Sequence, residues 1–219
     1  EAQVLAMGAS EFPEYDPLPA VPLELDLITE LTASRKPFLN QQFTFANLYQ
    51  HTQNLTYDII HLATHSNFQA GDTSNAYIHL WQERLHFDQL RELPWQQTRE
   101  LLVLSSCRTA LGDLQAELGF AGLAVNTGVK SALASLWSVH DLGTLALMSE
   151  FYHHLNDPTV TTKAEALRQA QLALLHRSEL AAVASHKQET VSPLFSQIQN
   201  RDFSHPYYWS SFLLIGSPW

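Results

Sequence analysis

Two side chains that could act together in nucleophilic catalysis closely follow two apolar runs of the chain. His65 comes after the run 57–63, and Cys107 comes after the run 101–104. An imidazole beside a cysteine favours the thiolate, and such a pair can attack a carbonyl carbon and then protonate the leaving amine. Cys107 is the only cysteine, so the chain forms no internal disulfide. A lone cysteine in apolar surroundings is most often a small buried side chain, and the placement of His65 is what favours a nucleophile.

Apolar runs of strand length alternate with helical segments along the chain. We predict strands at 4–7, 57–63, 101–104, 132–137 and 209–215, and helices at 23–31, 45–51, 142–155 and 166–175. This alternation is typical of a mostly parallel sheet with helices on both faces. The site of such a sheet lies at the carboxyl ends of its strands. We therefore expect His65 and Cys107 to face each other at one edge of the sheet.

Short polar patterns mark where helices and turns begin. Thr44 and Asp141 are placed to cap the second and third predicted helices, and Thr162 with Glu165 forms a capping box before the fourth. Two short runs on either side of the dipeptide 82–83 predict a hairpin after the strand that precedes His65.

Length and composition predict one domain over residues 1–219, soluble and cytoplasmic. The chain has 45% hydrophobic residues and a formal net charge of -10, which disfavours nucleic acid and anionic membranes as partners. It begins with Glu1, and we expect it to be a piece excised from a longer chain. The poorly patterned segment 178–204 is predicted to be a surface loop with some helix, and a candidate lid or regulatory element.

Neither a cofactor nor a metal is expected. The sequence contains no Gly-rich phosphate loop and no G-x-S-x-G elbow. His61 and His65 have the spacing of two zinc ligands on a helix, but the helical metalloprotease pattern requires a Glu directly after the first His. The residues around them favour a strand, so we interpret His61 as a core or supporting histidine.

Five segments spread over nearly the whole chain resemble the CHAT domain family, a bacterial branch related to caspases and separases. These segments are Tyr57–His65, Leu101–Ala110, Glu117–Ala124, Lys130–Trp137 and His205–Phe212. The resemblance implies a caspase-like three-layer α/β sandwich with a mostly parallel central sheet and a Cys/His dyad. It also implies tetratricopeptide repeats in the parent chain, which recruit partners or hold the peptidase inactive.

By this resemblance each catalytic role falls on a numbered residue. His65 would act as general base and then acid, Cys107 as nucleophile, and the backbone N–H groups of Ser66 and Cys107 as the oxyanion hole. An extended peptide, added as a strand, would contact Ser135 and Trp137. A substrate with a basic residue would meet an acid in the pocket, supplied by Asp141 or Asp113. Asp141 is also open to the simpler interpretation of a helix cap.

Two functions of different classes remain open. The first is a cysteine endopeptidase that cleaves a protein partner in an intracellular signalling or defence system. The second is a degenerate CHAT module that acts as a regulatory protein-binding or sensor domain. Ser66 favours the second, because the family usually has Gly at this position. The presence of both His65 and Cys107 favours the first.

Overall fold

The structure is a computed structural model that describes most of the chain. The described residues are 2–53, 57–67, 76–95, 100–105, 114–176, 180 and 193–219, with the backbone alone for 114–119, 195 and 199. Cys107 and Asp113 therefore lie outside the described residues, as does most of the segment 178–204.

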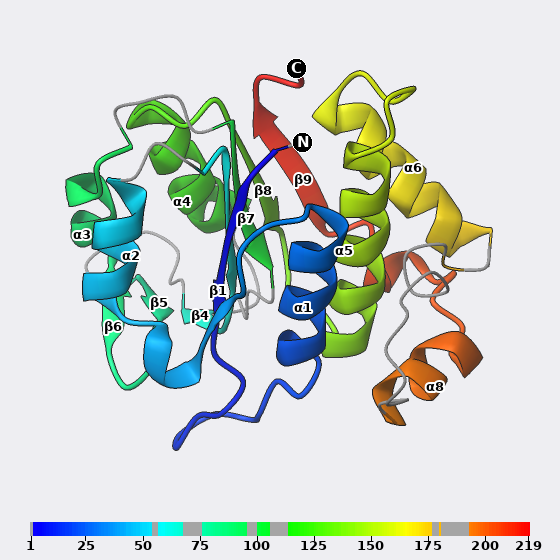
Figure 1. The fold of residues 1–219 in the computed structure, drawn as a ribbon, viewed down its shortest axis with the longest axis horizontal. Coiled ribbons are helices and arrows are strands. Elements are labelled where there is room, and N and C mark those ends of the chain that lie inside the picture. Colours follow the sequence, from blue (N-terminus) through cyan, green and yellow to red (C-terminus); the bar gives the residue numbers. More distant parts are fainter. Residues whose placement is uncertain are drawn as a thin grey trace.

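A six-stranded sheet forms the middle layer of the molecule (Figure 1). Its strands, in spatial order, are β2 (Phe38–Leu39), β1 (Val4–Gly8), β3 (Ile59–Ala63), β7 (Leu101–Ser105), β8 (Ser131–Ser135) and β9 (Phe212–Gly216). The first five run parallel, and β9 pairs antiparallel with β8. This sheet confirms the predicted fold class, and each of the five predicted strands is present.

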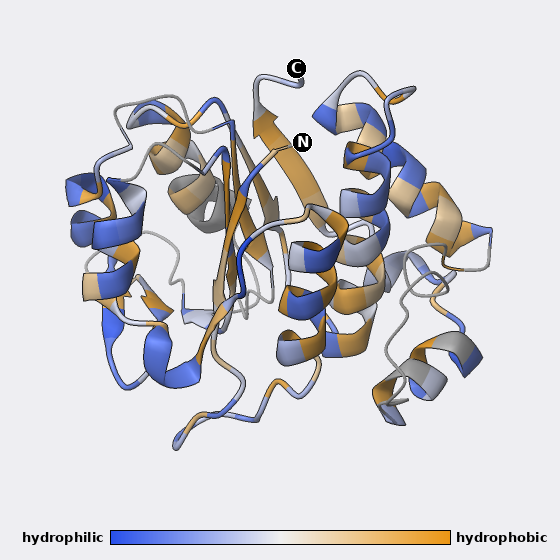
Figure 2. Cartoon of the chain, viewed as in Figure 1, coloured by the Kyte–Doolittle hydropathy of each residue, from blue (hydrophilic) through white to orange (hydrophobic). Residues whose placement is uncertain are grey.

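Helices cover both faces of the sheet. On one side lie α1 (Val21–Leu31), α5 (Asp141–Leu155) and α6 (Lys163–Leu175), and on the other lie α2 (Phe45–Thr52), α3 (Phe87–Glu92) and α4 (Leu114–Asn126) (Figure 1). Figure 2 shows hydrophobic strands in the middle of the molecule. The hydrophilic surfaces of the helices on either side are turned outward. No helix in the described part of the chain is both long enough and apolar enough to cross a bilayer.

Side chains along each strand alternate between two separate cores. In β1, Val4 and Ala6 join the core under α1 and α5, whereas Leu5 and Met7 join the core under α2, α3 and α4. The period of two follows from the pleat of the strand. Residues 59, 61 and 63 of β3 therefore face α1 and α5, which places His61 on that side of the sheet.

Two of the three predicted helix caps are present in the structure. The Thr44 hydroxyl accepts from the backbone N–H of Asn47 at the start of α2, and the Thr162 hydroxyl accepts from Glu165 at the start of α6. The predicted cap at Asp141 is wrong, because Asp141 is the first residue of α5 and its cap position is His140.

A small antiparallel sheet follows β3, as the hairpin pattern predicted. It consists of β4 (Ser66–Asn67), β5 (Tyr77–His79) and β6 (Arg84–His86). The segment 178–204, predicted as a loop or lid, contains the helix α8 (Pro193–Asn200), followed after Ser204 by the 3₁₀ helix η3 (Pro206–Tyr208). The role of this segment as a lid stays a prediction.

Gly8 allows β1 and β3 to pair closely where both strands end. A Cβ atom on Gly8 would lie 2.5 Å from the carbonyl oxygen of Ala63. We expect Gly8→Ala to lower the free energy of unfolding by about 1–3 kcal/mol, because the backbone must shift to admit the methyl group. Urea unfolding measures the change. Gly122→Ala in α4 is the matched control, because its Cβ would meet no atom of the described residues within 4 Å, and it should stabilise by up to about 1 kcal/mol. Equal effects of both substitutions would contradict the close approach.

Candidate active site

The register of the sheet brings the ends of β3 and β7 together. Ala63 lies opposite Ser105 in the parallel pair, and the Thr64 N–H donates to the Ser105 carbonyl oxygen at 3.4 Å. His65 is two residues beyond Ala63, and Cys107 is two residues beyond Ser105. Strands β3 and β7 end at the same edge of the sheet, as expected from parallel strands. The contact between His65 and Cys107 remains a prediction, because Cys107 lies outside the described residues.

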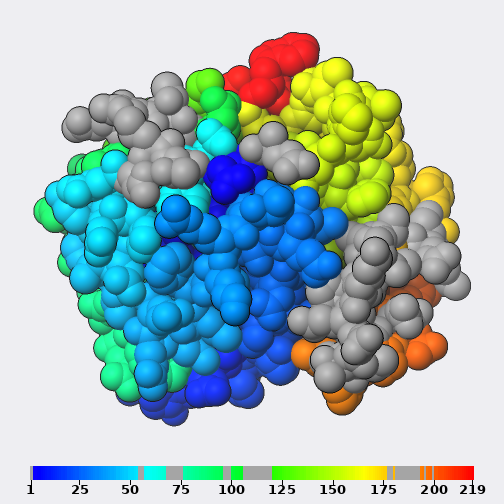
Figure 3. Space-filling view, in the orientation of Figure 1, coloured from blue at the N-terminus to red at the C-terminus, as the bar shows by residue number. Residues whose placement is uncertain are grey.

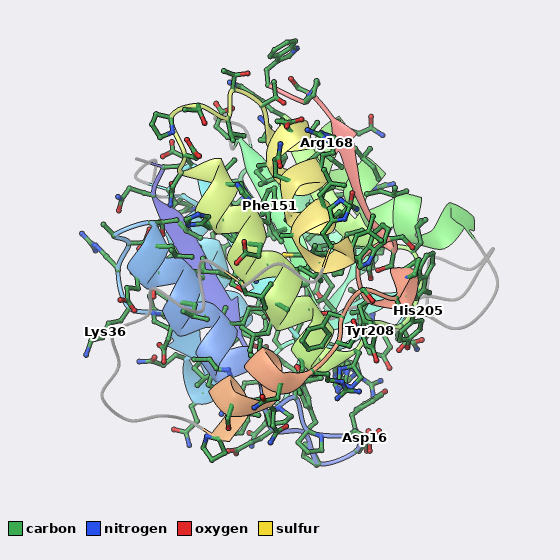
Figure 4. The ribbon with its side chains drawn as sticks, turned by 90° about the vertical axis from the view of Figure 1, so that its right-hand side faces the viewer. Asp16, Lys36, Phe151, Arg168, His205 and Tyr208 are labelled. Carbon is green, nitrogen blue, oxygen red and sulfur yellow. The ribbon has the colours of Figure 1, made fainter. Side chains whose placement is uncertain are left out.

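A backbone carbonyl orients the imidazole of His65. His65 is 5% exposed, and its Nε2 atom lies 2.8 Å from the carbonyl oxygen of Asp16. A carbonyl oxygen can only accept a hydrogen bond, so Nε2 carries the hydrogen and donates it. In the neutral ring the lone pair is then on Nδ1, the atom that could take a proton from a thiol. Figure 4 shows Asp16 on the loop that leaves the carboxyl end of β1.

Two aromatic rings from the same loop pack against the imidazole of His65. The ring centroid of Phe12 lies 4.6 Å from that of His65, and the centroid of Tyr15 lies 5.5 Å away. Rings packed in this way, together with the bond to Asp16, restrict the imidazole to one orientation, which a general base requires.

A buried polar cluster lies directly beneath this edge of the sheet. His61 Nε2 is 2.9 Å from Glu24 Oε1 and 3.1 Å from Ser105 Oγ, and His61 Nδ1 is 3.1 Å from the Tyr152 hydroxyl. Glu24 and His61 are both 0% exposed. Burial, and secondarily the charge of Glu24, raise the pKa of Tyr152 well above its ordinary value. This cluster joins α1, α5 and β3 to the last residue of β7 and so anchors the start of the segment that carries Cys107.

His61 and His65, whose spacing matches that of two zinc ligands on a helix, make separate contacts in the structure. His61 lies on strand β3 and points into the core toward Glu24, whereas His65 lies beyond the strand and bonds Asp16. Among the residues that the structure describes, no three side chains of His, Cys, Asp or Glu gather as a metal site would need.

Ser66, the predicted oxyanion-hole residue, lies at the start of β4 opposite Ile78. The φ angle of Ser66 is not in the left-handed region, which among the described non-glycine residues is adopted by Ala33, Asn40 and Gln82. A residue other than glycine therefore fits this position without backbone strain. The side chain of Ser66 is buried and its Oγ has no hydrogen-bond partner among the described residues.

The two predicted peptide contacts lie at the end of β8. Ser135 is the last residue of β8, pairs with Phe212 of β9, and has a buried hydroxyl without a partner in the described part of the chain. The indole Nε1 of Trp137 donates to the carbonyl oxygen of Tyr207 at 3.3 Å. Since β9 occupies one side of β8, an added peptide strand would have to approach from the side of β7. The register with β7 covers only residues 132 and 133 of β8.

Asp141 caps a helix other than its own. Its Oδ2 atom accepts from the backbone N–H of Ala20, the cap residue of α1, at 2.8 Å, while its Oδ1 is buried with no partner among the described residues. Burial, together with the charge of Glu24, raises the pKa of Asp141 from 3.8 to about 6, and the Ala20 N–H opposes this rise. The carboxyl group thus has a structural contact, and its predicted role toward substrate stays a prediction.

The raised pKa of Asp141 predicts a pH-dependent stability. The folded protein holds this proton more tightly than the unfolded chain, so the stabilisation is complete below pH of about 4 and is lost as pH rises through about 6. The full loss is up to about 3 kcal/mol. In Asp141→Asn, which keeps an acceptor for Ala20, this part of the pH dependence should vanish. Urea unfolding of both proteins from pH 4 to 7 measures it, and parallel pH profiles would contradict the assignment.

Four residues of the site were not predicted from the sequence. The carbonyl of Asp16 acts through a backbone atom, which no residue type reveals. Phe12 and Tyr15 lie in a loop without apolar periodicity. Glu24 carried a usable signal, since it is a carboxyl group within the apolar helix 23–31 and opposes a histidine in the middle of an apolar strand.

The arrangement of sheet, helices and strand-end residues defines a caspase-like α/β fold. Among solved structures, the crystal structure of the Arg-specific cysteine proteinase gingipain R (RGPB) is similar, with a TM-score of 0.52 and 14% sequence identity. The match covers 99% of this chain and 46% of that chain, so the present chain spans less than half the length of that proteinase. The CHAT domain family matches residues 1–217, and the chain belongs to this family. No curated protein matches the sequence.

Proposed function

We propose that this chain is the catalytic part of a cysteine endopeptidase that cleaves a protein partner. The observation that carries the proposal is the placement of His65, which is buried beside the end of β7 with Nε2 bound to the Asp16 carbonyl. Because Nε2 donates in that bond, the lone pair of the neutral ring is on Nδ1, the nitrogen that we assign as the base. The family and the fold support a peptidase, and the position of Cys107 two residues after β7 supplies the nucleophile.

The proposed reaction needs only groups of this chain and water. Nδ1 of His65 takes the thiol proton of Cys107, and the thiolate attacks the scissile carbonyl carbon. The oxyanion that forms would accept hydrogen bonds from the backbone N–H groups of Ser66 and Cys107. As the C–N bond breaks, His65 gives the proton to the leaving amine, and a thioester to Cys107 remains. Water, deprotonated by His65, then hydrolyses the thioester and restores the thiol.

The end of β8 is the proposed place for the peptide main chain. An extended peptide could add on the β7 side of residues 134–135, beyond the short register of the two strands. Ser135 and Trp137 would then lie beside it. Partner repeats of the parent chain, of the tetratricopeptide type, would bring the substrate to this edge.

The test is the reactivity of Cys107 toward a peptidyl chloromethyl ketone near neutral pH, followed by mass spectrometry. We expect covalent modification much faster than that of N-acetylcysteine, and none in Cys107→Ala. A Cys107 that reacts no faster than the free thiol would overturn the proposal. The chain would then be better described as a degenerate CHAT module with a regulatory protein-binding or sensor role.

A further inference from the structure

A pocket of about 350 Å³ opens beside the candidate active site. Its two walls are residues 11–15, which follow β1, and residues 79–84, which form the turn of the β5–β6 hairpin. In Figure 3 the dark blue residues that follow β1 reach the surface at the lower edge of the molecule, next to the blue-green hairpin.

The lining of this pocket carries an excess of negative charge. Glu11, Glu14 and Glu83 contribute three carboxylates, and Arg84 contributes one cation. Arg84 lies 3.7 Å from Glu14 and its guanidinium stacks 4.5 Å above the ring of Tyr77, so it neutralises only part of the charge. Such a lining attracts a positively charged group and repels an anion.

His79 provides a second and independent sign of a ligand. It lines the pocket, is 8% exposed, and its Nε2 atom has no hydrogen-bond partner among the residues described. A buried polar atom without a partner costs about 1–3 kcal/mol, which a ligand N–H could recover. Burial, followed by the charges of Arg84 and His65, lowers the pKa of His79 to about 4. The neutral imidazole can accept from such an N–H without repelling a cation.

Aromatic side chains complete the chemistry of the pocket. Tyr15 and Trp81 line it together with the aliphatic Leu80. Long basic side chains bury their methylene groups against such surfaces and keep the charged end among polar partners. An aromatic face also attracts a cation directly.

The pocket and the candidate base share one wall. Phe12 lies close to both histidines, with its ring centroid 4.6 Å from that of His65 and 6.0 Å from that of His79. The ring centroid of Tyr15 lies 5.5 Å from that of His65 and 4.4 Å from that of His79. The His79 N–H also donates to the His65 carbonyl oxygen at 2.9 Å. A ligand that orders residues 12–15 would therefore also order Asp16, whose carbonyl holds His65.

We propose that this pocket binds an arginine or lysine side chain of the protein substrate. That the ligand belongs to a substrate rests on the proposed function, whereas the binding of a basic side chain does not. The charged end lies among Glu11, Glu14 and Glu83 and donates to His79, and the methylene stem lies along Tyr15 and Trp81. The pocket thus selects substrates with a basic residue near the cleaved bond.

The experiment follows the imidazole resonances of His79 by NMR in the full 219-residue chain. The probes are N-acetyl-arginine methylamide and its neutral citrulline counterpart, and His79→Gln assigns the signal. We expect the arginine compound to shift the His79 resonances in a saturable way and the citrulline compound to have little effect. Glu14→Gln should weaken arginine binding by up to about fivefold, as expected for one partly exposed charge pair. Arg84→Gln should strengthen it, because the competing cation is removed.

A matched control and a separate readout keep the outcomes distinct. Glu30→Gln removes an exposed carboxylate from α1, outside the pocket, and should leave arginine binding unchanged. Equal shifts with arginine and citrulline, or no shift of His79 at all, would overturn the pocket. An unreactive Cys107 with a normal response of His79 would remove the proposed peptidase activity and leave the binding site standing.

Discussion

Replacing His65 by glutamine is expected to slow modification of Cys107 by a peptidyl chloromethyl ketone by roughly 10²–10⁴-fold, the usual contribution of a general base. The glutamine amide can still donate to the Asp16 carbonyl, which now lies 2.8 Å from the imidazole Nε2. It cannot accept the thiol proton. The substitution therefore removes the base and retains the contact that orders the loop. The second-order rate constant, measured by mass spectrometry across pH 6–9, gives the effect.

Two controls separate loss of the base from loss of structure. His176→Gln makes the same change at an exposed position after α6 and should leave the rate unchanged. Urea unfolding of His65→Gln should show a small change in stability, because the bond to Asp16 is replaced in kind. In the variant, the pH profile of labelling should follow the titration of an ordinary thiol. An unchanged rate in His65→Gln would show that the imidazole does not activate Cys107.

The parallel sheet could be predicted because each of its long strands has an apolar run of its own. β1 and β3 are buried on both faces, so their residues, apart from His61, are apolar without alternation. The runs were recognisable by their length and by the glycine or polar residue that ends them. The two-residue strands β2 and β4 were not predicted. Two residues carry no periodicity, and their pairing depends on where the tertiary structure brings them.

Only the part of the candidate site that lies at the ends of strands could be predicted from the sequence. The register of Ala63 and Ser105 brings the ends of β3 and β7 to one edge, and this follows from strand order. Asp141 shows the limit of local patterns, because its position directly before the predicted helix 142–155 is typical of a cap. In the folded chain its carboxylate reaches Ala20 on α1 instead. That contact joins residues 121 positions apart in sequence, a distance that no capping rule covers.

Replacing Glu24 by methionine is expected to lower the free energy of unfolding by about 3 kcal/mol, the lower end of the range for breaking a buried pair. The carboxylate is 0% exposed and lies 2.9 Å from His61 Nε2, so its loss leaves a buried imidazole with one partner fewer. Two facts limit the cost. Ser105 Oγ still reaches the same nitrogen at 3.1 Å, and Glu24 Oε2 already lacks a partner among the described residues.

The double variant Glu24→Met with His61→Leu should be more stable than Glu24→Met alone. Removing both partners leaves no orphaned polar group between them, whereas removing one does. Urea unfolding of the two single variants and the double variant gives the coupling energy. Glu30→Met, the same substitution at an exposed position of α1, should change stability by less than about 0.5 kcal/mol. Additive effects at Glu24 and His61 would mean that their contact does not hold α1 against β3. The end of β7 would then be held by its sheet hydrogen bonds and by packing, without a contribution from this pair.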